Sequence, residues 1–240
     1  MSMLEDIPET RKIVEEAIEI IERRYNRTLR DLLAESFSKV INEIEEEAEK
    51  IYKEYEREAI KKYLQRKNLI NKDVIEVIIR IIENSLVTSI SNTRRARAGY
   101  TSQYILFKAL NIMGISCEIS KIKYEGYRPD ISVPNDATLK NDPNRGFAIA
   151  VKRTLRERWA EDIDIFKFPN SAFVLIKPDP DLINIADDMV KRGMKRVYVP
   201  DTLFEEHKEK LVKLKIFKRL SDLPKDLINF LKRYKYTLHL

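Results

Sequence analysis

Two stretches of the chain decide its fold: Arg128-Pro129-Asp130-Ile131-Ser132-Val133-Pro134 and, after a polar loop, Phe147-Ala148-Ile149-Ala150-Val151-Lys152. Each contains a short apolar run, which is typical of a strand in a buried sheet. The first run follows Asp130, and the second ends on Lys152. Because neighbouring strands lie about 4.8 Å apart, the two strands can bring this carboxylate and this lysine together.

The chain around these two runs alternates between strands and helices. A helix is predicted to end at Gly114, a hairpin to turn at Glu125-Gly126, and a polar loop to span 134–146. The expected strands are 115–124, 127–133, 147–152, 172–176 and 196–199, and the expected helices are 100–113, 181–192 and those that begin near Thr154, Thr202 and Ser221. This alternation predicts an α/β (α+β) fold, with a mixed central sheet flanked by helices.

The N-terminal part, from residue 10 to about residue 90, shows helical periodicity and no convincing strand. Thr28 and Asn71 are plausible N-caps, which would divide it into about three helices. Alternating charges between Glu43 and Lys62 indicate a solvated helix face, and the alternative is an arm for dimerisation or DNA clamping. We expect two regions: an all-helical part at 1–90 and the α/β domain at 91–240.

Composition limits the class of protein. With 240 residues and 43% hydrophobic content, the chain can bury a sizeable core. It has no apolar stretch long enough for a membrane span, no secretory signal and one cysteine, Cys117, so we expect a cytoplasmic protein with this thiol buried. Few glycines beside abundant Ile, Lys and Glu resemble the composition of thermophile proteins. A formal net charge of +6 permits an anionic partner, and no glycine-rich phosphate loop indicates a nucleotide cofactor.

Asp130 and Lys152 fit the requirements of phosphodiester hydrolysis. Magnesium can neutralise a phosphoryl group and activate water while bound to one or two carboxylates. Asp130 is the candidate metal ligand, and Lys152 is the candidate for orienting the water or offsetting charge. Three arginines within four residues, Arg94, Arg95 and Arg97, suit contacts with a phosphate backbone.

The arrangement resembles the PD-(D/E)xK nuclease fold. Three successive stretches are similar to motifs of the EcoRII C-terminal-like type II restriction endonucleases: Ser91-Asn92-Thr93-Arg94-Arg95-Ala96-Arg97-Ala98-Gly99, the Pro-Asp strand, and Lys152-Arg153-Thr154-Leu155-Arg156-Glu157-Arg158-Trp159. A later stretch, Arg196-Val197-Tyr198-Val199-Pro200-Asp201, resembles the final strand of that family. The resemblance covers about 91–220.

The resemblance implies a role for several residues. Asp130 would bind the metal, and Lys152 would be the catalytic lysine. A basic, acidic, basic triplet reads guanine-cytosine pairs in the family, and here it falls on Arg156, Glu157 and Arg158. This pairing is chemically sound, because arginine bonds bidentately to guanine and a carboxylate can accept from cytosine. Trp159, beside the triplet, is expected in the core.

Two positions depart from the family pattern. The acid expected two residues before the lysine is replaced by Ala150. In this branch of the fold the acid moves to the following helix, but the residue thirteen after Lys152 is Ile165. The second departure is Gln103, four residues after Gly99, where relatives carry a glutamate. A glutamine there can orient water or bond a DNA base, which makes Gln103 a candidate DNA-binding residue, but it cannot supply negative charge. The candidates for the second metal ligand are Asp164 first, with Glu161 and Asp162 in reserve.

These observations predict a Mg²⁺-dependent, sequence-specific double-stranded DNA endonuclease of the type II restriction class. A symmetric duplex site is most simply cut by two related subunits, so a homodimer is expected. Two alternatives remain open. One is a structure-specific repair or junction nuclease on the same fold. The other is a non-catalytic DNA-binding protein on a decayed nuclease fold, which Ala150 and Gln103 suggest.

Overall fold

Long helices form the N-terminal part of the protein. The computed structural model describes residues 6–66, 86–124 and 126–234, with only the backbone described at 86–93, 95, 156–158 and 161. The helices are α1 (Thr10–Tyr25), α2 (Leu29–Arg66) and α4 (Leu86–Ile112). Thr28 caps α2 as predicted, since its Oγ1 accepts a hydrogen bond from the backbone N–H of Asp31 at 3.2 Å. The other predicted cap, Asn71, lies outside the described residues.

A mixed six-stranded sheet forms the centre of the α/β part, with its strands in sequence order. The strands are β1 (Glu118–Ile119), β2 (Ile131–Val133), β3 (Phe147–Lys152), β4 (Ser171–Leu175), β5 (Val197–Val199) and β6 (Phe217–Arg219). β1, β2 and β3 pair antiparallel, whereas β3 to β6 pair parallel. The predicted mixed sheet is therefore confirmed.

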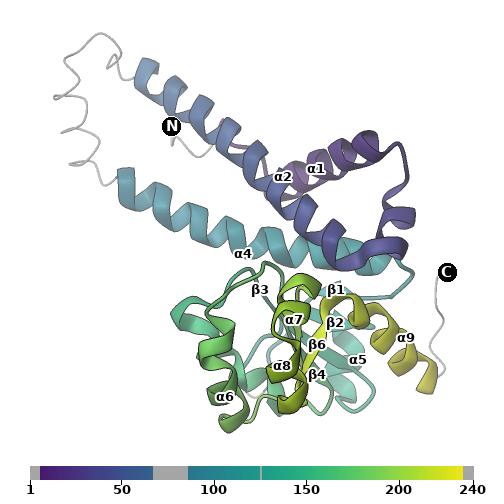
Figure 1. Ribbon diagram of the computed structural model, residues 1–240. Helices are drawn as coiled ribbons and strands as arrows, with labels where there is room; N and C mark the ends of the chain where they lie inside the picture. Colours follow the sequence, from purple (N-terminus) through teal and green to yellow (C-terminus); the bar gives the residue numbers. More distant parts are fainter. Residues whose placement is uncertain (1–5, 67–85, 125, 235–240) are drawn as a thin grey trace.

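Helical segments connect the parallel strands, as parallel pairing requires. The connecting and flanking elements are α5 (Asp136–Asn141), the 3₁₀ helix η2 (Arg156–Lys167), α6 (Leu182–Lys191), α7 (Asp201–Glu206), α8 (Lys208–Leu214), the short 3₁₀ turn η3 (Leu220–Asp222) and α9 (Leu223–Arg233). Figure 1 shows α2 and α4 running above the α/β part and extending past it, with α6 and α8 below them. Buried side chains of α6, α7 and α8 belong to a different hydrophobic cluster from those of α2 and α4.

Alternation along β3 sends its side chains to two different cores. Ile149 and Val151 join the buried cluster formed with α1, α2, α4 and α9. Ala148 and Ala150 join the second cluster, formed with η2, α6, α7 and α8. Because side chains alternate across a strand, Lys152 at the end of β3 belongs to the same side as Ala150. This places the lysine on the side of the sheet where η2 packs.

Several local predictions were wrong. α4 begins at Leu86, well before the expected start at residue 100, and Arg94 and Arg97 in this added part contact Glu56 and Tyr52 of α2. The predicted loop contains α5, whose N-cap Asn135 accepts from the backbone N–H of Thr138 at 2.8 Å. The edge strand β6 is short and half polar, so it gave no apolar signal in the sequence. The hairpin strands reduce to β1, β2 and a bridge between Tyr124 and Tyr127.

The expected boundary at residue 90 falls inside α4. Buried residues of α1 and α2, such as Ile21 and Ile44, belong to the same hydrophobic cluster as Ile149 of β3. α4 packs against β3 and β1, and α1 and α2 pack against α4, so the helical part and the strands share one core.

Candidate active site

Asp130 lies immediately before β2 and is held against β3. Its backbone N–H donates to the carbonyl of Ile149 at 2.9 Å, and its Oδ2 accepts from the backbone N–H of Val151 at 2.6 Å. Its Oδ1 accepts from Nε2 of Gln103 on α4. Burial raises the pKa of Asp130 to about 6, although the Val151 N–H and the Lys152 charge act in the opposite direction. The ionised carboxylate is thus less stable here than in water.

Lys152 forms an ion pair with a second carboxylate. Its Nζ lies 2.8 Å from Oδ2 of Asp162 on η2, and the Asp162 side chain is only 9% exposed. The other oxygen of this carboxylate accepts from the Tyr127 hydroxyl at 2.9 Å. Asp130 in turn bonds to the backbone N–H of Val151, the residue directly before Lys152. One site is therefore formed by Asp130, Lys152 and Asp162. The lysine side chain is 30% exposed, so solvent reaches this site.

The 3₁₀ geometry of η2 explains why Asp162, and not Asp164, faces this site. The segment after Lys152 was expected to be an α-helix, which would place Asp164 on the same face as Glu157. A 3₁₀ helix has three residues per turn, and the residues Trp159, Asp162 and Ile165, spaced by three, are all buried. Asp164 points to solvent and pairs with Lys167 at 3.2 Å. Asp162, which the sequence kept in reserve, therefore replaces Asp164 as the candidate for the second metal ligand.

The remaining acidic candidate and the triplet that the sequence predicts to read bases belong to η2. The side chains of Glu161, Arg156, Glu157 and Arg158 lie outside the described part of the chain, although their backbone belongs to η2. Trp159, beside the triplet, is 8% exposed and packs in the core as expected, with the Arg192 guanidinium 5.3 Å from its ring centroid.

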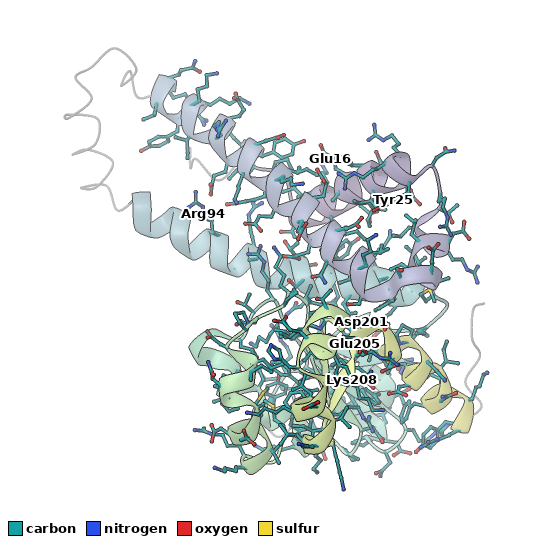
Figure 2. All side chains as sticks on the ribbon, in the orientation of Figure 1. Glu16, Tyr25, Arg94, Asp201, Glu205 and Lys208 are labelled. Atoms are coloured by element: carbon teal, nitrogen blue, oxygen red, sulfur yellow. The ribbon has the colours of Figure 1, made fainter. Side chains whose placement is uncertain are left out.

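The arginines expected to grip phosphates have partners within the protein. They precede the helix that was expected at 100–113, but in the structure they lie inside α4. Arg94 forms an ion pair with Glu56 of α2, and Figure 2 shows it on the part of α4 that extends beyond the sheet. Arg97 donates to the carbonyl of Pro8 at 2.7 Å and lies over the Tyr52 ring. The side chain of Arg95 is outside the described residues.

Two participants were not anticipated from the sequence. Tyr127 is buried, and its burial raises the pKa of the phenol, so it donates to Asp162 as a neutral hydroxyl. Arg153, the neighbour of Lys152, pairs with acidic residues of α2. No role was assigned to Tyr127 from the sequence, and none was assigned to Arg153 although this residue lies in the stretch that follows Lys152, so only their partners in space reveal them.

The donors at this site fit magnesium. Among the described residues no group of three or more His, Cys, Asp or Glu side chains gathers at one point. Magnesium does not need such a cage, since it is commonly held by one or two carboxylates together with substrate phosphates and waters. Asp130 and Asp162 supply two carboxylates, and burial raises the pKa of Asp130 more than the Val151 N–H and the charges of Lys152 and Arg128 lower it.

The mixed sheet, its flanking helices and the placement of Asp130 and Lys152 define a restriction-endonuclease-like fold. Among solved structures, the chain is similar to the restriction endonuclease PspGI in complex with substrate DNA, with 27% identity, a TM-score of 0.76, and coverage of 97% of this chain and 96% of that chain.

The structure is also similar to metal-depleted Ecl18kI in complex with uncleaved DNA, with 16% identity, a TM-score of 0.72, and coverage of 97% of this chain and 82% of that chain. For Ecl18kI with uncleaved, modified DNA the values are 16% identity, a TM-score of 0.70, and coverage of 98% and 83%. No protein-family model and no curated protein matches the chain. In the described segments, no helix is long and apolar enough to cross a membrane.

Proposed function

We propose that this protein is a Mg²⁺-dependent, sequence-specific endonuclease that cleaves double-stranded DNA, of the type II restriction class. The observation that carries the proposal is the cluster of Asp130, Lys152 and Asp162 at the meeting point of β2, β3 and η2. The similarity to PspGI bound to its substrate DNA, over nearly the whole of both chains, supports it. The sequence motifs further favour the EcoRII C-terminal-like family.

Each residue of the site has a distinct role in this proposal. Asp130 and Asp162 would hold the metal, and the chemistry that magnesium supplies when bound is neutralisation of phosphoryl charge and activation of water. Lys152 contributes a positive charge that orients the attacking water and offsets the charge on the phosphoryl group. The water oxygen bonds to phosphorus, the bond from phosphorus to the leaving oxygen breaks, and that oxygen takes up a proton. Tyr127 holds Asp162 in place through its hydrogen bond.

DNA recognition is assigned to the start of η2. Arg156, Glu157 and Arg158 follow the catalytic lysine closely along the chain, so bases can be read beside the cleaved bond. Arginine and glutamate suit the major-groove edges of guanine and cytosine, and we therefore propose a short site that contains G·C pairs. Cleavage of both strands of such a site is assigned to a homodimer, in which each subunit cuts one strand.

The proposal is tested by incubating a plasmid with the protein and magnesium and sequencing the ends of the products. Discrete fragments with one shared end sequence are expected. Asp130→Ala and Lys152→Ala should abolish cleavage while DNA binding is retained. A smear without fixed ends would refute sequence specificity, and preferential cleavage of branched DNA would favour a junction nuclease.

A second candidate is a non-catalytic DNA-binding protein built on the same fold. It is favoured by Ala150 and Gln103, which stand where this family carries acids. Tight DNA binding without cleavage, after prolonged incubation with magnesium or manganese, would establish this alternative.

A further inference from the structure

We propose that Glu45 of α2 is a positioning residue for the active site, acting through Arg153, which directly follows β3, and through Ser102 on α4. This inference rests on the proposed function, because the geometry it controls is that of Lys152 and Asp130. It assigns the N-terminal helices a part in catalysis, where the sequence indicated a solvated face or, as the alternative, an arm for dimerisation or DNA clamping.

The first contact joins α2 to the end of β3. Arg153 directly follows Lys152, and its Nε lies 2.7 Å from Oε1 of Glu45. A terminal nitrogen of the same guanidinium bonds to Glu49, one turn further along α2. The planar guanidinium fork is thus held on two sides, which fixes the residue that follows the catalytic lysine.

The second contact joins α2 to the helix that carries Gln103. Ser102 is fully buried, and its hydroxyl donates to Oε2 of Glu45 at 3.2 Å. The next residue, Gln103, donates to Asp130. One carboxylate therefore bonds to the sequence neighbour of each of two active-site residues, Lys152 and Gln103.

Neighbouring contacts extend the same connection to β4. Lys177 follows β4, and its Nζ lies 3.0 Å from Oε2 of Glu49. The backbone N–H of Lys177 donates to the carbonyl of Arg153 at 3.0 Å, and that of Ile176 donates to the carbonyl of Lys152 at 2.9 Å. The ends of β3 and β4 are therefore joined to one another and to α2.

Burial makes this arrangement specific. The Glu45 side chain is 2% exposed, and a buried carboxylate is retained only where charged or polar partners satisfy it. Glu47, two residues further along the same helix, pairs instead with Arg24 of α1 at 2.6 Å. It does not contact the strand ends in any described interaction, so it offers a matched control for the loss of one carboxylate from α2.

The test compares Glu45→Gln, Arg153→Lys, the double variant and the control Glu47→Gln. Glu45→Gln keeps the shape and removes the charge, whereas Arg153→Lys keeps the charge and removes the fork. Three quantities are measured: the single-turnover cleavage rate at saturating protein, the DNA dissociation constant without divalent metal, and amide hydrogen exchange of peptides that cover 147–153.

Glu45→Gln and Arg153→Lys should each cleave about 10- to 100-fold more slowly than wild type, as expected when a catalytic group is displaced by a fraction of an ångström to 1 Å. Their DNA affinity should be unchanged. Glu47→Gln should stay within about twofold of wild type, because an ion pair remote from the strands contributes little. The double variant should lose less activity than the product of the two single losses, because both changes break the same ion pair between Glu45 and Arg153.

Exchange at 147–153 should be faster in Glu45→Gln than in Glu47→Gln. The proposal is overturned if Glu45→Gln matches the control in both rate and exchange, or if weaker DNA binding accounts for the whole loss. If Glu45→Gln does not fold, Arg153→Lys carries the same comparison. If the wild-type protein cleaves no DNA, the proposed function fails, while the exchange measurement still decides whether Glu45 fixes β3.

Discussion

Replacing Asp130 by asparagine should stabilise the metal-free protein while it abolishes cleavage. Burial raises the pKa of Asp130 to about 6, from an ordinary value of 3.8. A carboxyl group with a raised folded-state pKa stabilises the fold only below its unfolded pKa, and this contribution is lost as the pH rises through the folded pKa. At neutral pH the ionised Asp130 therefore destabilises the native state.

The size of the effect follows from the shift. A shift of about two pH units corresponds to about 3 kcal/mol at pH 8, and less than about 1 kcal/mol at pH 4, where the native carboxyl is already protonated. Asparagine can replace the carboxyl in place: its oxygen accepts from the Val151 N–H, and its NH₂ donates to Gln103 once that amide is turned.

The assay is urea unfolding of wild type and Asp130→Asn in a chelator, at about pH 8 and about pH 4. The variant should be more stable at the higher pH, and the difference should nearly vanish at the lower pH. Adding magnesium should stabilise wild type but not the variant, because only wild type binds the ion tightly in its native state.

Asp226→Asn is the control with the opposite sign. Burial acts to raise the pKa of Asp226, but hydrogen bonds from Lys218 and Tyr198 outweigh it and lower that pKa. Asp226→Asn should therefore destabilise the protein at neutral pH. If Asp130→Asn also lowered stability at about pH 8, the assignment of Asp130 as a buried carboxylate in need of a cation would be refuted.

The remaining predictions concern the second acid, the missing glutamate and the thiol. Asp162→Asn should slow plasmid cleavage at least about tenfold, as for loss of a group that orients or holds a metal. Asp164→Asn should cleave like wild type. Equal losses of cleavage rate in the two variants would contradict the conclusion that the 3₁₀ helix turns Asp162, and not Asp164, toward the site. Gln103→Glu should destabilise the metal-free protein, because it adds a like charge beside Asp130. It should also lower the magnesium concentration needed for thermal stabilisation. An unchanged magnesium dependence would exclude a metal-binding contribution from the added glutamate. Burial raises the pKa of Cys117 to about 12, so a thiol reagent at about pH 8 should label it only after denaturant is added, and rapid labelling of the native protein would contradict its burial.

Much of the fold could be predicted because its determinants are local. The apolar run that became β3 has the predicted bounds, Phe147–Lys152, since a buried strand is a continuous apolar segment that ends at polar residues. Gly114 follows the end of α4, as expected. Its φ is 79°, a value that glycine adopts without strain. By contrast, β6 and α5 are short, and contacts with distant segments decide whether such short segments form.

The sequence by itself determined the α/β architecture and brought Asp130 and Lys152 to notice, because periodicity and residue type are properties of neighbours along the chain. Tertiary structure alone decided that Asp162 faces Lys152 at 2.8 Å while Asp164 faces solvent. The physical reason is that a 3₁₀ helix has three residues per turn in place of 3.6, so Asp162 and Asp164 take different positions around the axis from those in an α-helix. Packing of the buried Trp159 and Ile165 against the sheet selects that geometry. Likewise, the pairing of Glu45 with Arg153, 108 positions away along the chain (153 − 45 = 108), exists only because α2 packs against the end of β3.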